Sequence, residues 1–499
     1  MLFHDIFAHH PKEREAIIDQ DRSVTYGEFQ DLVERWAAYF EALGVKKGDR
    51  VGLVSKNCLE FIVTYFAVIK AGGVIVPINF QLVPREIAYI VKDTAMKLLV
   101  VKEALPLAEP LQELSAPSLM QITFDELHHA PEQEFVPVSL TETDPSTIIY
   151  TSGTTGKPKG AMLSHGNLYA NARDFMESIP LTAEDTALCV LPMYHCFAWT
   201  VCVAGPLLCG GRIVIQAVYQ FKAAMRLVKQ YGVTMFTGVP AVYRLLHESR
   251  DLDSVDSVRY FISGGAPLGL DLARGFALKF GRPVLGGYGL SEASPVVSVN
   301  LPHKVKVGSI GPTIAHVKAK IINAHGEEVP HFERGELLVK GPNVMLGYLN
   351  LPDATAKAIE KDGWLHTGDV GYMDEDGFIF LVDRVKDMII SSGENVYPRE
   401  IEEVVSAYPG VAECSVIGIP DALRGQAICL YVVPREGETI DKKALRQYLI
   451  GRIAPYKVPR EYFLVESLPK TALGKVRKNV LRDETVAILS KNKFAGRAL

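Results

Sequence analysis

Cysteine is sparse in this chain, and its arrangement excludes two kinds of stabilising chemistry. The 499 residues include seven cysteines, an odd number, scattered mostly through apolar stretches and without a C-x-x-C pair. Structural zinc sites and disulfide frameworks use closely spaced, paired cysteines. The thiols are therefore expected to be reduced and buried, which is typical of a cytoplasmic protein.

A surplus of positive charge is also missing. Lysine and arginine number 53 against 58 aspartate and glutamate residues, which gives a formal net charge of −5. Proteins that bind nucleic acid or anionic membranes usually carry a basic surface, so neither partner is predicted. The N-terminal residues MLFHDIFAHHPKERE have no basic segment ahead of a long apolar core, and no signal peptide is expected. Peripheral contact with a membrane, and the choice between a monomer and a homodimer, stay open.

Long hydrophobic runs are rare, with one exception. Residues 187–211, ALCVLPMYHCFAWTVCVAGPLLCGG, contain no Asp, Glu, Lys or Arg and are long enough to span a membrane. Pro192, Pro206 and the pair Gly210-Gly211 interrupt this run, and His195 lies near its middle. We therefore predict a buried internal helix with irregular ends rather than a spanning one.

Elsewhere, short apolar segments alternate with helices. Residues 50–79 predict a strand, RVGLVS, then a helix capped by Asn57, then a second strand, VIVPIN. The same order recurs after STIIY, VTMFTG and RYFIS. Apolar strands that alternate with helices favour mostly parallel sheets covered on both faces, which is a doubly wound α/β arrangement.

Two changes in the pattern mark further parts of the chain. From about 307 to 348, short alternating strands separated by Gly and Pro turns predict a small β-rich subdomain. Beyond 384–386, an acidic amphipathic helix, two strands, a second helix and a basic tail predict a small α+β domain. The domain boundary is therefore placed at 384–386.

The segment TSGTTGKPKG, residues 151–160, directly follows an apolar strand. Its glycines allow tight turns in which backbone N–H groups converge on an anion, and its hydroxyls and lysines add donors and charge. A Walker loop places Ser or Thr after the lysine, but here Pro158 occupies that place. The segment therefore predicts a phosphate loop that is not of the Walker type. Considered without the rest of the sequence, the same ten residues could instead form a solvated polar turn.

Four further motifs follow this loop. They are GYGLSE (287–292), GWLHTGD (363–369), DRVKDMIISSGENVYP (383–398) and PKTALGKVRK (469–478). In this order and spacing the five motifs span nearly the whole chain and resemble the adenylate-forming acyl-CoA synthetase family, and the second half looks most like the fatty acyl-CoA ligases. The resemblance implies an α/β fold. A large N-terminal domain (1–383) would bind ATP and the acyl group. It would consist of two doubly wound α/β subdomains and a small β-barrel-like subdomain. A hinge (384–386) and a small mobile α+β C-terminal domain (387–499) would follow.

The implied activity uses ATP, Mg²⁺ and, as co-substrate, CoA. A carboxylate is a poor electrophile at neutral pH, so its oxygen must first attack the α-phosphate of ATP, which gives acyl-AMP and pyrophosphate. The CoA thiol then attacks acyl-AMP and releases AMP. Because two anions must meet in the first step, the site has to supply cations and backbone donors where phosphoryl charge develops.

The resemblance implies a nucleotide site built from these motifs. The phosphate loop would use Thr151, Ser152, Gly153, Thr154, Thr155 and Lys159, and the adenine slot would use Gly264, Gly265, Ala266, Gly287, Tyr288 and Gly289. Ser291 would contact the α-phosphate, and Glu292, with Thr151, would hold Mg²⁺. Asp369 would accept the ribose hydroxyls, and Arg384 would reach ribose or phosphate. Taken singly, these residue types are more often turn or core residues.

The C-terminal motifs imply a moving domain. Lys475 would neutralise the substrate carboxylate and the α-phosphate during adenylation, although a basic run of this kind is usually just a solvated face. Lys386 would act as the hinge, and Ser392, Gly393 and Glu394 would build the CoA channel after the domain rotates. Together with Glu292, Thr151 and His195, Lys475 is an expected catalytic residue.

The acyl pocket would be lined by His195, Trp199, Gly264 and Gly289. Trp199 resembles the gating tryptophan of some long-chain fatty acyl ligases, and a buried core tryptophan is the competing interpretation. The segment after His195 has no Lys or Arg to pair a second carboxylate, which favours a medium- or long-chain fatty acid over a malonate-like acid. An aryl acid of the benzoate or cinnamate type, an adenylation enzyme that loads a separate carrier protein, and an inactive acyl- or nucleotide-binding protein stay open.

Overall fold

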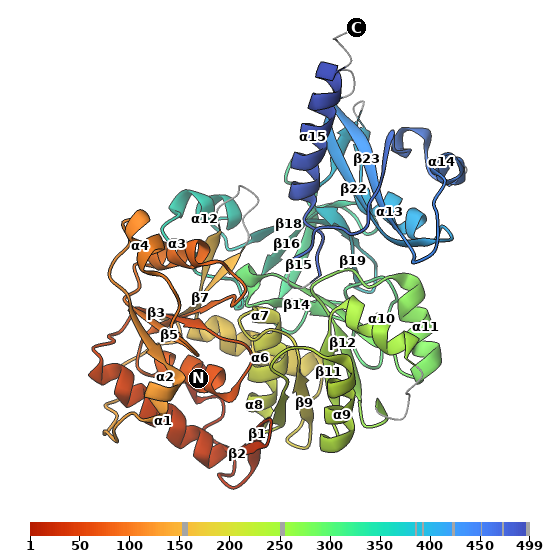
Figure 1. Cartoon of the computed structure of the whole chain (residues 1–499). Helices are drawn as coiled ribbons and strands as arrows, with labels where there is room; N and C mark the ends of the chain where they lie inside the picture. Colours follow the sequence, from red (N-terminus) through yellow and green to blue (C-terminus); the bar gives the residue numbers. More distant parts are fainter. Residues whose placement is uncertain are drawn as a thin grey trace. The chain divides into compact units, whose positions relative to one another are not determined.

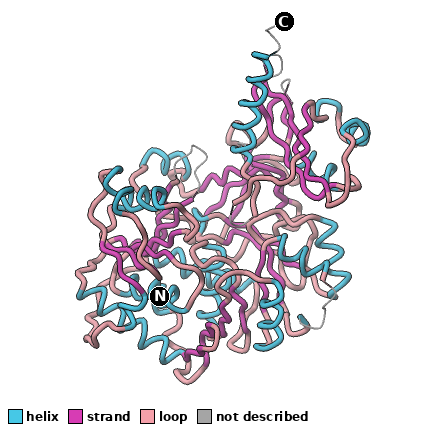
Figure 2. Tube along the Cα trace, in the orientation of Figure 1, coloured by secondary structure: helices cyan, strands magenta, loops and turns pink. Residues whose placement is uncertain are grey.

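The structure is a computed structural model, and it describes residues 1–151, 158–249, 255–384, 387–391, 394–421, 425–450, 452–471 and 474–495. Two units are distinguished by their internal contacts. The first contains Met1–Gly264, Leu270–Ala319 and Leu338–His366, and the second contains Gly265–Gly269, Lys320–Leu337 and Thr367–Leu499. Figures 1 and 2 trace the elements of each unit. The predicted boundary and hinge at 384–386 stay predictions, and 385–386 lie outside the described residues.

The first unit contains a seven-stranded sheet with the order β17-β8-β7-β4-β3-β5-β6. Its strands are β3 (Arg50–Val54), β4 (Val74–Ile78), β5 (Leu98–Val101), β6 (Met120–Thr123), β7 (Pro145–Thr151), β8 (Lys159–Ser164) and β17 (Gly347–Tyr348). The strands from β7 to β6 pair in parallel, and β8 pairs antiparallel with both β7 and β17. The predicted strand–helix–strand unit at 50–79 is confirmed as β3, α2 (Leu59–Lys70) and β4.

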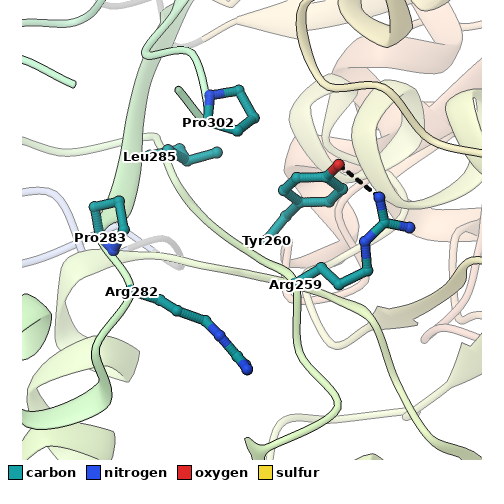
Figure 3. Close-up of a pocket in the computed structure, with 6 residues that line it drawn as sticks. All are labelled: Arg259, Tyr260, Arg282, Pro283, Leu285 and Pro302. Atoms are coloured by element: carbon teal, nitrogen blue, oxygen red, sulfur yellow. Dashed lines mark hydrogen bonds between the residues drawn. The ribbon is translucent and has the colours of Figure 1, made fainter. Parts of the chain in front are cut away.

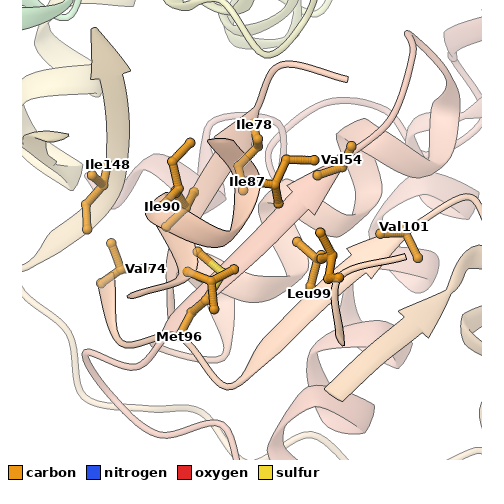
Figure 4. Packing of buried hydrophobic residues seen from close by; sticks show 12 residues of the cluster. Val54, Val74, Ile78, Ile87, Ile90, Met96, Leu99, Val101 and Ile148 are labelled. Atoms are coloured by element: carbon orange, nitrogen blue, oxygen red, sulfur yellow. The ribbon is translucent and has the colours of Figure 1, made fainter. Parts of the chain in front are cut away.

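An aliphatic core packs between this sheet and helix α3 (Pro84–Thr94) (Figure 4). Its members come from β3, β4, β5 and α3, and they include Val54, Val74, Ile78, Ile87, Ile90, Leu99 and Val101. Gly52 lies in β3 where a Cβ atom would come within 2.5 Å of Leu99 Cδ1 and 2.7 Å of Met96 Sδ, so a side chain here would require these two core side chains to move. Burial of each large aliphatic side chain contributes about 1.5–3 kcal/mol.

The prediction that Asn57 caps α2 is wrong. The helix begins one residue later, with Cys58 at the N-cap position, and the backbone N–H of Leu59 donates to Asp19 Oδ2 at 2.8 Å. Asn57 is buried, and its amide donates to the backbone oxygens of Leu191 and Gln216. The residue ties the two sheets of the first unit together, a long-range role that local sequence cannot show.

The second sheet of the first unit has eight strands in the order β14-β13-β12-β11-β9-β10-β1-β2. They are β1 (Glu15–Asp19), β2 (Arg22–Thr25), β9 (Thr186–Cys189), β10 (Arg212–Ile215), β11 (Met235–Gly238), β12 (Tyr260–Ser263), β13 (Val284–Gly289) and β14 (Val296–Val299). The six strands between β13 and β1 pair in parallel, and the two edge strands pair antiparallel. Helices α9 (Phe221–Tyr231), α10 (Pro240–Glu248) and α11 (Leu270–Phe280) connect or flank these strands (Figure 1).

The charge-free run at 187–211 forms a buried, irregular helix, as predicted. After β9 it continues as α7 (Cys196–Ala198), the π-helical turn η2 (Trp199–Ala204) and α8 (Gly205–Cys209). All six side chains of η2 are buried. Among the helices of the described residues, none combines the length and the apolar character that crossing a membrane requires.

The second unit carries most of a four-stranded sheet with the order β15-β16-β18-β19, formed by Lys318–Ile322, Gly335–Lys340, Leu365–Met373 and Ile379–Arg384. A further sheet has the order β21-β20-β23-β22, with β24 on β23. Its strands are β20 (Ile389–Ser391), β21 (Glu394–Val396), β22 (Val411–Asp421), β23 (Gly425–Pro434) and β24 (Glu461–Leu464). Helices α13 (Pro398–Ser406), α14 (Lys442–Ile450) and α15 (Lys478–Ala495) complete the small α+β part.

Two buried histidines make the first unit sensitive to acid. His4 and His165 are 7% and 1% exposed, and their rings pack edge to face with centroids 5.3 Å apart. Burial lowers the pKa of His4 from 6.5 to about 4 and that of His165 to about 3. Protons therefore bind the unfolded chain first as the pH falls below 6.5, and the free energy of unfolding decreases.

We expect each of these histidines to lower the free energy of unfolding by about 1.4 kcal/mol per pH unit between the unfolded and folded pKa values. Urea unfolding measured from neutral pH to about pH 4 should show a plateau at the neutral end and a steep loss below it. His4→Phe should flatten the loss, whereas His325→Gln, at an exposed turn, should not. Identical pH profiles for wild type and His4→Phe would contradict the assignment.

Candidate active site

The two ends of the predicted phosphate loop meet on neighbouring strands. Thr151 ends β7 and Lys159 begins β8, and these two residues stand opposite each other in the antiparallel ladder. Residues 152–157 lie outside the described residues, so Ser152, Gly153, Thr154 and Thr155 stay predictions. The ladder joins the loop's ends, which makes the segment the connection of a hairpin.

Side chains from α3 hold the strands that carry this loop. The hydroxyl of Tyr150 donates to Asp93 Oδ2 at 2.5 Å, and the hydroxyl of Tyr89 donates to the Pro158 carbonyl at 3.4 Å. A Cβ atom on Gly160 would come within 2.8 Å of Ile148 Cγ2. The strand ends that carry the predicted loop are therefore held in place by the core beneath them. A site that binds charged groups in a set position requires such a rigid support.

Glu292 lies at the end of β13, in the short helix η4 (Ser291–Ala293). Its Oε1 accepts a hydrogen bond of 2.8 Å from the hydroxyl of Tyr348, and Lys159 Nζ lies 4.9 Å from the centroid of the Tyr348 ring. Oε2 of Glu292 has no hydrogen-bond partner among the described residues. The predicted metal ligand and a predicted phosphate ligand therefore share one neighbour, Tyr348, which the sequence analysis missed.

The turn that carries Glu292 is fixed by three polar side chains. Asn343 donates to the Ala293 carbonyl at 2.9 Å, Ser294 donates to the Asn343 carbonyl at 2.8 Å, and Thr200 donates to the Ser294 carbonyl at 3.0 Å. Asn343, Ser294 and Thr200 are buried. These bonds tie the turn both to η2 and to the segment before β17.

The turn predicted to bind phosphate touches the predicted acyl segment directly. Ser291 Oγ and Cys196 Sγ lie 3.3 Å apart, and Cys196 follows His195. Burial raises the pKa of Cys196 to about 11, so this thiol is a neutral packing neighbour rather than a nucleophile. Ser291 and His195, which the resemblance placed at the α-phosphate and at the acyl–phosphate junction, therefore lie on adjoining segments.

His195 is held as a neutral ring. Its Nδ1 accepts a hydrogen bond of 3.2 Å from the backbone N–H of Phe197, which places the ring proton on Nε2. Burial lowers the pKa of His195 to about 4. A neutral imidazole cannot pair with a second carboxylate, but it can donate one hydrogen bond from Nε2.

Glycine is required at two predicted pocket positions. A Cβ atom on Gly264 would come within 2.8 Å of the Phe197 ring, and one on Gly289 would come within 2.2 Å of the Pro295 carbonyl oxygen. The tip of the Phe197 ring therefore lies against the backbone at Gly264, and the β13–β14 turn closes tightly at Gly289. Sequence reasoning selected both glycines but missed Phe197, whose contact is visible only in three dimensions.

Trp199 is packed in an aromatic cluster. It is 2% exposed, stacks on Tyr65 with centroids 3.7 Å apart, and contacts Phe66 and Phe61 at 5.5 and 6.0 Å. Its buried Nε1 has no hydrogen-bond partner among the described residues. This packing is that of a core tryptophan, and its role as a gate stays a prediction.

The predicted ribose pair lies in the second unit. Asp369 is 5% exposed, and in the antiparallel ladder of β18 and β19 it stands opposite Arg384. The backbone N–H of Asp369 donates to Thr367 Oγ1 at 3.1 Å, and Thr367 donates to the Leu337 carbonyl at 2.6 Å. Two motifs separated in sequence therefore meet on neighbouring strands. Gly265 and Ala266 also belong to this unit, while Gly264, Gly287 and Tyr288 belong to the first.

Lys475 lies on an exposed turn before α15. Thr471 organises the turn, because its backbone N–H donates to the Lys475 carbonyl at 2.8 Å and its Oγ1 accepts from the Lys475 N–H at 3.2 Å. Ser392, Gly393 and Lys386 lie outside the described residues, and Glu394 begins β21 opposite Ser391 of β20. The hinge and CoA-channel roles therefore stay predictions.

A hollow of about 340 Å³ is lined by none of these residues (Figure 3). It is lined by Arg259, Tyr260, Arg282, Pro283, Leu285 and Pro302, which lie at the starts of β12 and β13 or nearby. Of the predicted site residues, Gly264 directly follows β12, and 287–289 form the carboxyl end of β13. Ligands of parallel α/β sheets bind outside the carboxyl ends of strands, so the hollow is not the candidate active site.

An acidic cluster on α6 (His165–Ser178) also differs from the predicted metal site. Asp174, Glu177 and His316 bring ligand atoms within 4.8 Å of one another. The guanidinium of Arg173 already lies 2.7 Å from Asp174 Oδ1 and 3.2 Å from His316 Nδ1. Because Arg173 supplies the positive charge that a metal would supply, we interpret the cluster as an ion-pair network.

Comparison with known proteins identifies the family. The family model for AMP-binding enzymes matches residues 3–349, and the model for their C-terminal domain matches residues 400–475. The chain belongs to the AMP-binding enzyme family. The predicted recognition of an adenylate-forming family and the α/β fold are thereby confirmed.

Relatives within the AMP-binding enzyme family act on different acids. A feruloyl-CoA synthase from Amycolatopsis sp is 38% identical, over 92% of this chain and 94% of that protein. A long-chain-fatty-acid–CoA ligase from Bacillus subtilis (strain 168) is 33% identical, over 95% of this chain and 92% of that protein. The acid is therefore not decided by similarity.

Solved structures of AMP-binding enzymes match the whole fold. ATP-bound MatB from Rhodopseudomonas palustris gives a TM-score of 0.91 at 32% identity, with 97% of this chain and 99% of that chain covered. The o-succinylbenzoate coenzyme A synthetase MenE from Bacillus subtilis, in complex with ATP and a magnesium ion, gives 0.87 at 30% identity, with 96% and 99% covered. These relatives bind ATP, and MenE binds it with magnesium.

Proposed function

We propose that this AMP-binding enzyme is an ATP-dependent, AMP-forming ligase that joins a hydrophobic carboxylic acid to CoA. The observation that carries the proposal is the 3.3 Å contact between Ser291 and Cys196. It brings the turn with Glu292, expected at the phosphates, against the segment with His195, expected at the acid. A site where a carboxylate meets a phosphoryl group requires these two segments to adjoin.

The first half-reaction needs charge stabilisation from the chain's own residues. A carboxylate oxygen forms a bond to the α-phosphorus of ATP, and the bond to the bridging oxygen of pyrophosphate breaks. Lys159 and the Thr151 loop bind the leaving phosphates, Ser291 contacts the α-phosphate, and Lys475 neutralises the approaching anions. Magnesium fits Oε2 of Glu292, a hard ligand without a hydrogen-bond partner in the described part of the chain, and would supply further charge neutralisation there.

In the second half-reaction the thiol sulfur of CoA attacks the acyl carbon of acyl-AMP. The bond from that carbon to the AMP oxygen breaks, AMP leaves, and the thiol proton goes to solvent. Asp369 and Arg384 hold the ribose through both steps, and the segment at Ser392–Glu394 guides CoA to the site. Lys475 must withdraw before this step, which is why a hinge at Lys386 is part of the proposal.

For the acid we propose a medium- or long-chain fatty acid. Residues 187–211 include no Lys or Arg, and a neutral His195 can offer a second carboxylate one hydrogen bond but no opposite charge, so its negative charge would be buried uncompensated. An alkyl chain gains about 0.8 kcal/mol for each buried methylene. The long-chain fatty acid ligase among the relatives supports this choice.

An aryl acid of the ferulate type is a second candidate, and a specific observation favours it. Trp199 is stacked on Tyr65 at 3.7 Å, so a long alkyl chain that passes this point needs the tryptophan to move. A planar ring stacked near Phe197 needs no such movement. The feruloyl-CoA synthase among the relatives supports the same choice.

Pyrophosphate release measured across a panel of acids tests the proposal. The panel runs from acetate through medium-chain acids to palmitate, with benzoate, cinnamate, ferulate and malonate, each with and without CoA. Release that depends on a hydrophobic monocarboxylic acid, together with acyl-CoA formation, is the expected result. Highest activity with malonate, adenylate formation without transfer to CoA, or no release with any acid would each contradict the proposal.

Trp199→Leu separates the gate from the core interpretation. Removing an aromatic side chain from this cluster should lower the free energy of unfolding by roughly 2–4 kcal/mol in either case. Phe61→Leu, in the same cluster at 6.0 Å from Trp199, is the matched control. If Trp199 is a gate, only Trp199→Leu shifts the chain-length profile toward longer acids, as kcat/KM across the panel will show. Unchanged profiles in both variants would leave Trp199 as a core residue.

A further inference from the structure

Tyr348 occupies a tightly fixed position beside the phosphate loop. It belongs to the two-residue strand β17, which pairs with β8 so that Tyr348 stands opposite Ala161. The backbone N–H of Tyr348 donates to Thr355 Oγ1 at 2.9 Å. At Gly347, with φ 141°, a Cβ atom would come within 2.7 Å of Thr355 Cγ2. The backbone around Tyr348 therefore allows little movement.

The hydroxyl of Tyr348 points to Glu292. It donates to Oε1 at 2.8 Å, while Oε2 has no partner among the described residues. The phenol of a tyrosine is protonated at neutral pH, so the hydroxyl is the donor in this pair. A carboxylate with one oxygen held by a neutral donor keeps its negative charge and one oxygen for a cation.

The ring of the same residue faces a lysine. Lys159 Nζ lies 4.9 Å from the ring centroid, within the range of a cation–π contact. Both Lys159 and Tyr348 are half-buried, which strengthens such a contact relative to one in open water. Tyr348 therefore contacts Lys159, at the end of the predicted phosphate loop, with its ring face. Its hydroxyl contacts Glu292, the predicted metal ligand.

We propose that Tyr348 is a positioning residue that orients Glu292 toward the magnesium ion of MgATP and holds Lys159 over the phosphates. This inference rests on the proposed function, because it assigns Tyr348 a task in binding MgATP. The hydroxyl fixes which carboxylate oxygen of Glu292 faces the metal. The ring limits the positions that the Lys159 ammonium samples before ATP arrives, which reduces the entropy lost on binding.

The test compares binding of ATP with and without magnesium. In the full chain, Tyr348→Phe keeps the ring and removes only the hydroxyl. The Mg²⁺ concentration that gives half of the ATP-induced rise in melting temperature should increase about tenfold, since a hydrogen bond to a charged group is lost. ATP affinity in EDTA, measured by calorimetry, should change less than about twofold. Tyr372→Phe, whose ring stacks on Phe380 at 4.9 Å, is the matched control.

A second variant tests the contact with Lys159. Tyr348→Leu removes ring and hydroxyl, and it should weaken ATP binding in EDTA about threefold in addition to the magnesium effect. The KM for the acid should stay near the wild-type value in both variants. These separate readouts distinguish loss of the hydroxyl from loss of the ring.

Three outcomes are decisive. If Tyr348→Phe lowers the melting temperature of the free chain but leaves the Mg²⁺ dependence unchanged, Tyr348 is only a structural residue and the inference is overturned. If wild type itself shows no magnesium-dependent ATP binding, the proposed function fails, and this result is recognised before any variant is compared. A tenfold magnesium effect with an unchanged melting temperature in Tyr348→Phe supports the inference.

Discussion

Lys475→Ala is expected to abolish carboxylate-dependent pyrophosphate release and to leave thioester formation from supplied acyl-AMP largely intact. During adenylation two anions approach each other, and loss of the cation that neutralises them should cost about 100- to 1,000-fold in rate. During thioester formation the lysine is expected to be withdrawn, so its loss should matter little. Each half-reaction is measured alone, the first as pyrophosphate release and the second as acyl-CoA formed from synthetic acyl-AMP.

The matched control for this variant is Lys470→Ala in the same basic run. Lys470 Nζ forms an ion pair of 2.6 Å with Glu413 Oε1, so its charge is already engaged on the surface. Both half-reactions should stay near wild type in this control. Equal loss of both half-reactions in Lys475→Ala would show that the lysine supports the fold or a common step, and the adenylation role would be abandoned.

Lys386→Pro should preserve the first half-reaction and slow the complete reaction. Proline fixes φ near −65° and removes the backbone donor, so the hinge cannot absorb the rotation that carries the C-terminal domain between half-reactions. Pyrophosphate release in the first turnover should persist, while overall acyl-CoA formation should fall at least about tenfold. In a rapid-quench experiment, acyl-AMP should form in a burst and then decay slowly in the presence of CoA.

Lys386→Ala is the control for the hinge. It removes the side chain and keeps the backbone freedom, so turnover near wild type is expected. Normal turnover in Lys386→Pro would mean that no rotation occurs at this residue. Equal losses in Lys386→Pro and Lys386→Ala would assign the effect to the lysine side chain instead.

The sequence predicted well those features that depend on neighbouring residues. The strand–helix–strand unit at 50–79 and the buried helix at 187–211 follow from hydrophobic runs and their interruptions, and both are present. The resemblance assigned Asp369 and Arg384 to the ribose, but their opposite placement was not predicted, because no local pattern links residues on two different strands.

The features that the sequence missed depend on contacts over long distances. Asn57 looks like a helix cap because Asn is common there, but its amide is engaged by backbone oxygens at 191 and 216. Tyr348 stands in a two-residue strand that no periodicity reveals, and its partners Glu292 and Lys159 are far away in the chain. Phe197 was missed because its ring contacts the backbone of Gly264, which lies far from it in the sequence and carries no side chain.

The central claim is that the acid is activated as an acyl-adenylate, and isotope transfer tests it most directly. A fatty acid or ferulate labelled with a heavy oxygen isotope in its carboxylate is incubated with the full chain, MgATP and CoA, and the products are examined by mass spectrometry. Attack of the carboxylate on the α-phosphate predicts one heavy oxygen atom in each AMP and none in pyrophosphate. Unlabelled AMP, or label in inorganic phosphate with ADP as the product, would contradict the account.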